Sequence, residues 1–146
     1  MDQVMHFEYA VEGGDFFNAG AASSNVKKIL KKLNVDSHVV KRVAVALYEA
    51  EVNIVAHAYR GKIWVDIDGR RIKIILSDEG PGIPDIDLAM KAGYSTASPR
   101  VREMGFGAGM GLPNMKKNSD HLHITSAPGK GTQVEIINEL YESHAF

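Results

Sequence analysis

The sequence predicts an α+β two-layer sandwich, in which helices cover one face of a mixed, mainly antiparallel sheet. Along the 146 residues the expected elements run strand, helix, helix, strand, strand, helix, helix, strand, strand. Neighbouring strands are joined by short turns, which favour an antiparallel or mixed sheet. The regular alternation of strand and helix that a dinucleotide-binding fold requires is missing. These observations together predict the two-layer architecture.

The N-terminal segment predicts one strand and one helix. Residues 5–11 alternate apolar and polar side chains, as a half-buried strand does, and Gly13 and Gly14 end this pattern. Asp15 is expected to cap a helix over residues 15–33. The apolar side chains of this predicted helix are Phe16, Phe17, Ala21, Val26, Ile29, Leu30 and Leu33.

Four lysines crowd the end of this first predicted helix, namely Lys27, Lys28, Lys31 and Lys32. They are consistent with a solvated face, because positive charges suit a helix C-terminus. The alternative is a docking surface for an acidic partner. The sequence leaves both interpretations open.

The longest periodic segment of the chain predicts a second helix. Asp36 or Ser37 caps it, and Gly61 is expected to end it near Arg60. Its apolar side chains recur at the three- and four-residue spacing that places them on one face. They are Val39, Val40, Val43, Ala46, Leu47, Ala50 and Ile54.

The second half of the chain predicts two hairpins and two further helices. Strands over residues 62–68 and 71–78 are joined at Gly69, and a turn-rich loop follows at 78–85. The remaining predicted elements are a short helix at 85–91, an irregular segment at 93–108, a helix at 109–118, and strands at 121–127 and 132–140 with a turn between them.

The composition excludes several classes of function. Seventeen basic and eighteen acidic residues give a net charge of −1, so no overall field attracts nucleic acid or an anionic membrane. The absence of cysteine excludes disulfides, thiolate metal sites and cysteine nucleophiles. No signal peptide is recognised, and no apolar run approaches the ~20 residues of a membrane span. We therefore expect one cytoplasmic domain over residues 1–146.

Three polar side chains share one stripe of the second predicted helix. Glu49, Asn53 and His57 are spaced four residues apart among apolar neighbours, where a solvated face would carry more charged residues. The structural alternatives are an ordinary polar edge and a hydrogen-bonded packing histidine. Glu51 lies about 200° around the helix from the stripe, at ~100° per residue, and is assigned no role.

Two glycine-containing segments add to this pattern. Asp78 ends an apolar strand and opens the loop DEGPGI, which places a carboxylate beside backbone that a flat ring can approach. The exocyclic amine of adenine would satisfy such an acceptor, although an Asp-initiated turn is the alternative. Residues 106–120, FGAGMGLPNMKKNSD, place three glycines within six residues directly before a helix. That arrangement is suited to a phosphate group at a helix N-terminus.

The order and spacing of these signals resemble the nucleotide-binding fold of the GHKL, or Bergerat, ATPase superfamily. Its members include DNA gyrase, Hsp90, sensor histidine kinases and mismatch-repair ATPases. The segments EAEVNIVAHAY, DEGPGI, GMGLPNM and GKGTQVEI are similar to its N box, two glycine boxes and closing Gly-Thr strand. The resemblance covers about residues 36–137. Within the superfamily, the chain is most similar to bacterial anti-sigma-factor serine kinases and stress-module switch-protein kinases.

This resemblance implies a Mg-ATP-dependent protein serine/threonine kinase. Its implied substrate is a STAS-domain antagonist of the anti-anti-sigma or stressosome type, and a sigma factor or a phosphatase is the implied downstream partner. Several relatives dimerise, so a homodimer is compatible with the resemblance; no nucleic-acid or membrane partner is expected. The alternative is a non-catalytic, nucleotide-gated module that sequesters a sigma factor or another regulator. A pure binder would not need the carboxylate of Glu49, which favours the kinase.

The resemblance also implies roles for individual residues. Glu49 matches the catalytic carboxylate, and Asn53 matches the ligand of the Mg²⁺ that bridges the phosphates. Asp78 matches the acceptor for the adenine amine. In the segment that matches the ATP lid, Arg102 or Arg100 is a candidate to reach the γ-phosphate. The other implied nucleotide-binding positions are Gly80, Gly82, Ile83, Gly105, Gly107, Gly109, Met110, Gly111, Leu112 and Thr132.

Overall fold

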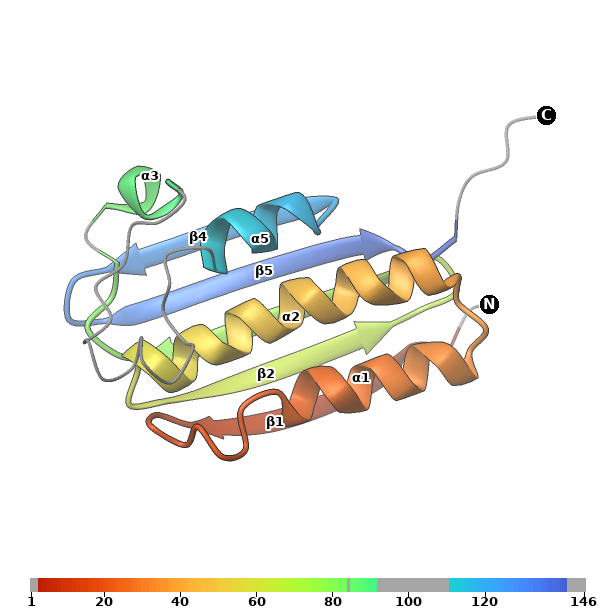
Figure 1. Cartoon of the computed structure of the whole chain (residues 1–146), viewed down its shortest axis with the longest axis horizontal. Coiled ribbons are helices and arrows are strands. Elements are labelled where there is room, and N and C mark those ends of the chain that lie inside the picture. The colour runs from red at the N-terminus through yellow and green to blue at the C-terminus, as the bar shows by residue number, and fades with distance from the viewer. Residues whose placement is uncertain (1–2, 84, 92–110, 142–146) are drawn as a thin grey trace.

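The computed structural model of the chain describes residues 3–83, 85–91 and 111–141. Helices lie over one face of a five-stranded sheet, as Figure 1 shows. The strand order is β1-β2-β3-β5-β4, and all four neighbouring pairs in this order are antiparallel. The predicted α+β sandwich is therefore confirmed. The elements are β1 Met5–Glu12, α1 Ala21–Lys32, α2 Ser37–His57, β2 Arg60–Ile67, β3 Arg71–Glu79, α3 Ile86–Ala89, α5 Gly111–Lys117, β4 His121–Ala127 and β5 Gly131–Glu139.

The long helix α2 lies at the centre of the helical layer, between α1 and α5 (Figure 1). It contacts both of these helices and four of the strands, β1, β2, β3 and β5. All the apolar positions predicted for this helix are buried, which confirms its apolar face. The largest fully buried side chains of the core are Leu30, Leu47, Ile63, Ile67, Ile72, Ile74, Met115, Ile136 and Leu140.

The strands alternate between a buried face and an open face. On β2, Ile63, Val65 and Ile67 are fully or almost fully buried, whereas Lys62 is exposed and Trp64 is half-buried. The Nζ atom of Lys62 lies 5.9 Å from the centre of the Trp64 ring. Because side chains on a strand alternate with a period of two, this pattern directs one face of the sheet toward the helices.

Helix α1 begins later than predicted, at Ala21 instead of Asp15. The side chain of Asp15 accepts hydrogen bonds from the backbone N–H and the side-chain amide of Asn18, which closes a local turn. Gly20 has φ 95°, a left-handed conformation that a right-handed helix does not allow. Phe17, which was placed in the apolar set of the predicted helix, is 95% exposed in this turn.

A buried carboxylate from α2 accepts the backbone N–H groups at the start of α1, where Gly20 is the N-cap residue. Glu51, only 2% exposed, accepts the backbone N–H of Gly20 at 3.0 Å, of Ala22 at 3.2 Å and of Ser23 at 3.1 Å. The first N–H groups of a helix lack partners within the helix, and the positive end of the helix dipole favours a carboxylate there. We name this contact the Glu51 clamp, and it ties α1 to α2.

The boundaries of α2 agree with the sequence at the start and differ at the end. Asp36 is the N-cap, and its side chain accepts a backbone N–H two residues later at 3.4 Å. The helix ends at His57, because Ala58 is already extended. Gly61 does not end the helix as predicted but lies within β2, where an added Cβ would stand 2.8 Å from Ile54. This glycine therefore permits close packing of α2 on the sheet.

The other predicted boundaries agree with the described structure to within two residues. Asp85 caps α3 by accepting the backbone N–H of Leu88 at 3.0 Å. In the turn between β2 and β3, Asp68 accepts the backbone N–H groups of Arg70 and Arg71. The predicted irregular segment 93–108 and the first two positions of the predicted helix 109–118 lie outside the described residues.

The Glu51 clamp gives the first testable prediction. Glu51→Ala leaves three backbone N–H groups without their acceptor, and each unsatisfied buried donor costs about 1–3 kcal/mol. We expect the free energy of unfolding to fall by about 2–4 kcal/mol, since water can reach part of the site. Urea denaturation followed by circular dichroism measures this. Glu51→Gln keeps one acceptor oxygen and should lose less; an undiminished stability in Glu51→Ala would contradict the clamp.

Candidate functional site

Two residues of the polar stripe on α2 face the first turn of α5. Glu49 accepts a hydrogen bond on Oε1 from the side-chain amide of Asn114 at 3.3 Å. A Cβ added to Gly111 would stand 3.3 Å from Oδ1 of Asn53 and 3.5 Å from Oε2 of Glu49. Glycine at this position therefore allows the start of α5 to approach closely two oxygen atoms that can bind a ligand.

The chemistry of these oxygen atoms fits a magnesium ion. Mg²⁺ prefers oxygen ligands and keeps several waters, taking one or two side chains together with the phosphates of its substrate. Within the described residues, the Asn53 amide and Oε2 of Glu49 have no hydrogen-bond partner. The same part of the chain contains no group of three His, Asp or Glu side chains that could hold a metal. The residues present thus fit an ion that obtains its other ligands from phosphates and water.

The environment of Glu49 alters its acidity. Burial raises the pKa of this carboxyl above its ordinary value, because the charged form loses solvation, and the Asn114 hydrogen bond acts in the opposite direction. A general base becomes more effective as its pKa approaches the working pH. Partial burial therefore makes Glu49 a stronger base than a solvated glutamate.

A second cluster forms around Asp78, the penultimate residue of β3. Its Oδ1 accepts the backbone N–H of Thr132 at 3.0 Å, and the Thr132 hydroxyl lies 2.8 Å from that of Ser126. No donor in the described part of the chain reaches Oδ2. Burial raises the pKa of Asp78, and the Thr132 hydrogen bond opposes this effect. The Asp78 carboxylate thus has one oxygen held by the protein and one available to a ligand.

Close backbone contacts hold the loop after β3 against the turn between β4 and β5. Gly82 has φ 79°, and an added Cβ would stand 2.3 Å from the carbonyl oxygen of Ala127. The next residue, Ile83, donates its backbone N–H to the hydroxyl of Ser126 at 2.7 Å. The two segments can approach this closely only because position 82 carries no side chain.

Two further glycines surround Asp78. A Cβ on Gly80 would stand 3.0 Å from the Cα of Ala58, just beyond the end of α2, and 3.3 Å from Oδ1 of Asp78. Gly131 has φ 90°, and its Cβ would stand 2.1 Å from the carbonyl oxygen of Asp78. Backbone from three separate parts of the chain therefore converges on this carboxylate.

The remaining predicted positions differ in how far the structure describes them. Leu112 places its side chain in the core with 6% exposed, so only its backbone can face a ligand. His57, the third member of the stripe, ends α2, and burial lowers its pKa and favours the neutral ring. The following predicted residues lie outside the described residues: Arg100, Arg102, Gly105, Gly107, Gly109 and Met110.

Sequence reasoning missed two residues that support the site. Asn114 donates a hydrogen bond to Glu49. It lies three positions after Gly111, and residues three apart share a helix face, so the sequence could have placed it at the site. Ser126 contacts Ile83 and Thr132 and donates to the carbonyl of Gly131 at 3.1 Å. A serine near the end of a strand carries no comparable signal.

Residues 38–141 match the family model described as histidine kinase-, DNA gyrase B- and HSP90-like ATPase. That range contains both clusters and most of the sheet. The chain belongs to this ATPase family. A solved structure, that of the mycobacterial sensor histidine kinase MprB, is similar with a TM-score of 0.53 and 16% identity, covering 92% of this chain and 97% of that one. This likeness shows the fold.

Named relatives of this ATPase agree with the function predicted from the sequence. The chain is 33% identical over 124 residues to the serine/threonine-protein kinase RsbT of Bacillus subtilis (strain 168), covering 82% of this chain and 87% of the relative. It is 33% identical over 124 residues to an anti-sigma F factor of Thermoanaerobacter sp. (strain X514), covering 82% of this chain and 83% of that relative. The predicted family and function class are confirmed. No helix of the described residues is long and apolar enough to cross a membrane.

The space beside Gly111 gives a second prediction. Gly111→Ala would place a methyl group 3.3 Å from Asn53 and 3.5 Å from Glu49. We expect the affinity for Mg-ADP to fall about tenfold, which corresponds to about 1.4 kcal/mol. Stability should change by less than about 1 kcal/mol, because the helix propensity of alanine and the close contact with Asn53 act in opposite directions. Isothermal titration calorimetry and urea denaturation measure the two quantities; undiminished Mg-ADP affinity would exclude a ligand from this space.

The acidity of Glu49 gives a third prediction. Its side-chain pKa should lie above the ordinary value of 4.5, as measured by ¹³C NMR titration of the carboxyl carbon. Asn114→Ala should raise it further, because the lost hydrogen bond stabilises the charged form. As pH falls, any activity that requires the ionised carboxylate should therefore begin to decline at a higher pH in the variant than in the wild type. A Glu49 pKa at or below 4.5 in the wild type would contradict the environment described.

Proposed function

We propose that the chain is a Mg-ATP-dependent protein serine/threonine kinase that phosphorylates a STAS-domain antagonist in a partner-switching module. The observation that carries the proposal is the pair of Glu49 and Asn53 facing Gly111, with oxygen atoms on both side chains open to a ligand. The relative named as a serine/threonine-protein kinase supports this class of reaction. The anti-sigma F factors among the relatives support a regulatory output.

The Asp78 cluster would bind the adenine ring. Oδ2 of Asp78 would accept the exocyclic amine, while the Thr132 backbone keeps the other oxygen in place. Gly80 and Gly82 allow this loop to pack against Ala58 and Ala127, which fixes the backbone beside which the ring would lie. The ionised carboxylate of Asp78 is the stronger acceptor, and burial raises its pKa, so nucleotide binding should weaken as pH falls toward that pKa.

The cluster on α2 would bind the phosphates. Asn53 would hold Mg²⁺ through Oδ1, and the ion would neutralise and orient the phosphate oxygens. Gly111 places the start of α5 beside the oxygen atoms of Asn53 and Glu49, next to which these groups would lie. Positioning and charge neutralisation supply most of the barrier reduction in phosphoryl transfer, so the rigidity of α2 is itself part of the proposed mechanism.

Glu49 would act on the incoming hydroxyl of the protein substrate. The hydroxyl oxygen forms a bond to the γ-phosphorus, the bond from that phosphorus to the bridging oxygen of ADP breaks, and the hydroxyl proton passes to Oε2 of Glu49. Asn114 holds Oε1 and so orients the carboxylate. The pKa of Glu49, raised by burial, favours this proton transfer.

The alternative is a nucleotide-gated module that sequesters a sigma factor without transferring phosphate. The anti-sigma F factors among the relatives favour an output of this kind. Both functions require Asn53 and Asp78, and only the kinase requires the carboxylate of Glu49. The two functions therefore separate at Glu49.

Phosphotransfer from γ-labelled ATP tests the proposal and gives a fourth prediction. The acceptors are the STAS-domain proteins of the same genome, with labelled residues mapped by mass spectrometry. Asn53→Ala should abolish Mg-dependent ATP binding. Glu49→Ala should keep ATP binding and lose about 10²–10⁴-fold in transfer, the range for a general base. Glu8→Ala, which removes an exposed carboxylate on β1, serves as the control.

Three outcomes separate the two functions. Label on a serine or threonine of one acceptor, lost in Glu49→Ala, supports the kinase. Normal transfer by Glu49→Ala would contradict the role of this carboxylate. Intact ATP binding with no labelled acceptor would favour the nucleotide-gated module.

A further inference from the structure

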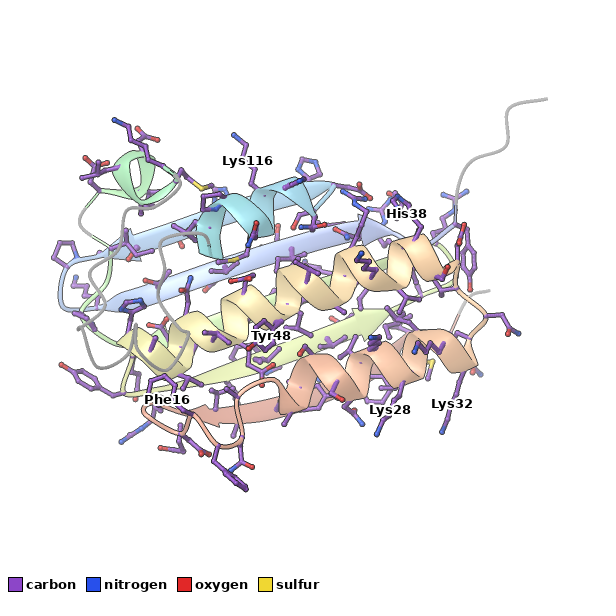
Figure 2. The ribbon with its side chains drawn as sticks, viewed as in Figure 1. Phe16, Lys28, Lys32, His38, Tyr48 and Lys116 are labelled. Carbon is purple, nitrogen blue, oxygen red and sulfur yellow. The ribbon has the colours of Figure 1, made fainter. Side chains whose placement is uncertain are left out.

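The lysines at the end of α1 divide between two sides of the helix. Lys27 and Lys31 line a groove together with Lys41 of α2. Lys28 and Lys32 project from α1 on the side away from α2, as Figure 2 shows. Residues one position apart are rotated by about 100° on a helix, which explains the division. The groove lysines therefore form a surface that the sequence alone did not define.

The groove lies between the C-terminal part of α1 and the N-terminal part of α2. Its volume is about 530 Å³, and Val35 and Val40 contribute apolar walls that are themselves 7% and 2% exposed. Asn34 and Ser37 add neutral polar groups. Three lysines therefore give the groove its charge, and no acidic side chain lines it.

The positive charge of the rim is not compensated by the protein. In the described parts of the chain, no carboxylate lies within the 4.0 Å of an ion pair from Lys27, Lys31 or Lys41. Residues 21–41 contain five lysines and one aspartate, in a chain whose net charge is −1. The concentration of positive charge is therefore local to this region.

Helix dipoles account for only part of this pattern. Lys31 lies in the last turn of α1, where a positive charge is favourable. Lys41 lies in the second turn of α2, beyond the Asp36 cap, so the dipole of its own helix does not favour its positive charge. A ligand of opposite charge would stabilise Lys41.

The features of the groove specify the chemistry of its occupant. A negatively charged segment would pair with the three lysines, and its side chains could also cover the aliphatic stems of these lysines. Nucleic acid would find no aromatic side chain or arginine lining the groove for stacking. An acidic peptide segment therefore fits the groove.

We propose that this groove docks an acidic segment of the STAS-domain substrate, away from the phosphotransfer site. This inference rests on the proposed function. Lys41 and Asn53 are twelve positions apart on α2, which corresponds to ~18 Å at 1.5 Å per residue. A domain of about 100 residues is roughly 30 Å across, so one partner can occupy the groove and present its hydroxyl to Glu49. Docking at the groove would raise the affinity for the substrate without entering the chemical step.

Matched charge reversals on α1 test the docking groove. Lys27→Glu/Lys31→Glu reverses two groove lysines, and Lys28→Glu/Lys32→Glu reverses two lysines on the same helix outside it. Phosphotransfer kinetics give KM and kcat for the STAS-domain substrate, and fluorescence anisotropy gives its Kd. For the groove pair we expect KM and Kd to rise about tenfold or more, with kcat and Mg-ADP affinity unchanged. For the control pair we expect changes below about threefold.

The outcomes distinguish this inference from the proposed function. An unchanged KM in the groove pair, or equal effects of the two pairs, would overturn the groove and leave the kinase intact. The wild type could instead bind a STAS-domain protein without transferring phosphate, while the groove pair loses this binding. That result would support the groove as the docking site of a STAS-domain partner and overturn the kinase. Failure of every STAS-domain protein to bind the wild type would overturn the docking inference. Circular dichroism of both variants confirms that each is folded.

Discussion

The packing of α2 on the sheet is the constraint on which the rest of the structure depends. Its apolar positions face the strands and fix its rotation, and this rotation decides what every polar side chain on the helix meets. Glu51 consequently meets α1, whereas Glu49 and Asn53 meet α5. One rigid helix therefore positions the core, the clamp and half of the candidate site.

Three partly or fully buried carboxylates differ in how many of their oxygen atoms are hydrogen-bonded by the protein. Glu51 has both oxygens bonded to backbone N–H groups, and it serves stability. Glu49 and Asp78 each have one oxygen bonded, and burial raises the pKa of both. Among the described residues no fully buried side-chain oxygen lacks a hydrogen-bond partner, so the second oxygens of Glu49 and Asp78 remain accessible to a ligand. The degree of hydrogen bonding thus separates the structural carboxylate from the two assigned to the site.

Local signals predicted much of the fold, and long-range contacts account for the errors. The apolar spacing and the Asp36 cap of α2 lie within one segment, so the sequence identified them. The start of α1 depends on Glu51, which lies about thirty positions away along the chain. Asp15 is a residue type that often caps a helix, but here it closes a turn. Gly61 was interpreted as a helix end because its close contact with Ile54 cannot be seen along the chain. The same limit applies to Ser126, whose partner Ile83 lies in the loop after β3, 43 positions away.

The continuity of α2 restricts how this chain can change through evolution. Residues 37–57 form one uninterrupted helix, so inserting or deleting one residue between Lys41 and Asn53 would rotate the two ends by about 100° relative to one another. Where the change falls before Glu49, either the apolar residues at the start of α2 would leave the core, or Glu49 and Glu51 would both leave their partners. A substitution alters one contact of α2, whereas a change of length alters many at once. We therefore expect homologues to vary in length at the loops between elements and to keep the number of residues in this helix.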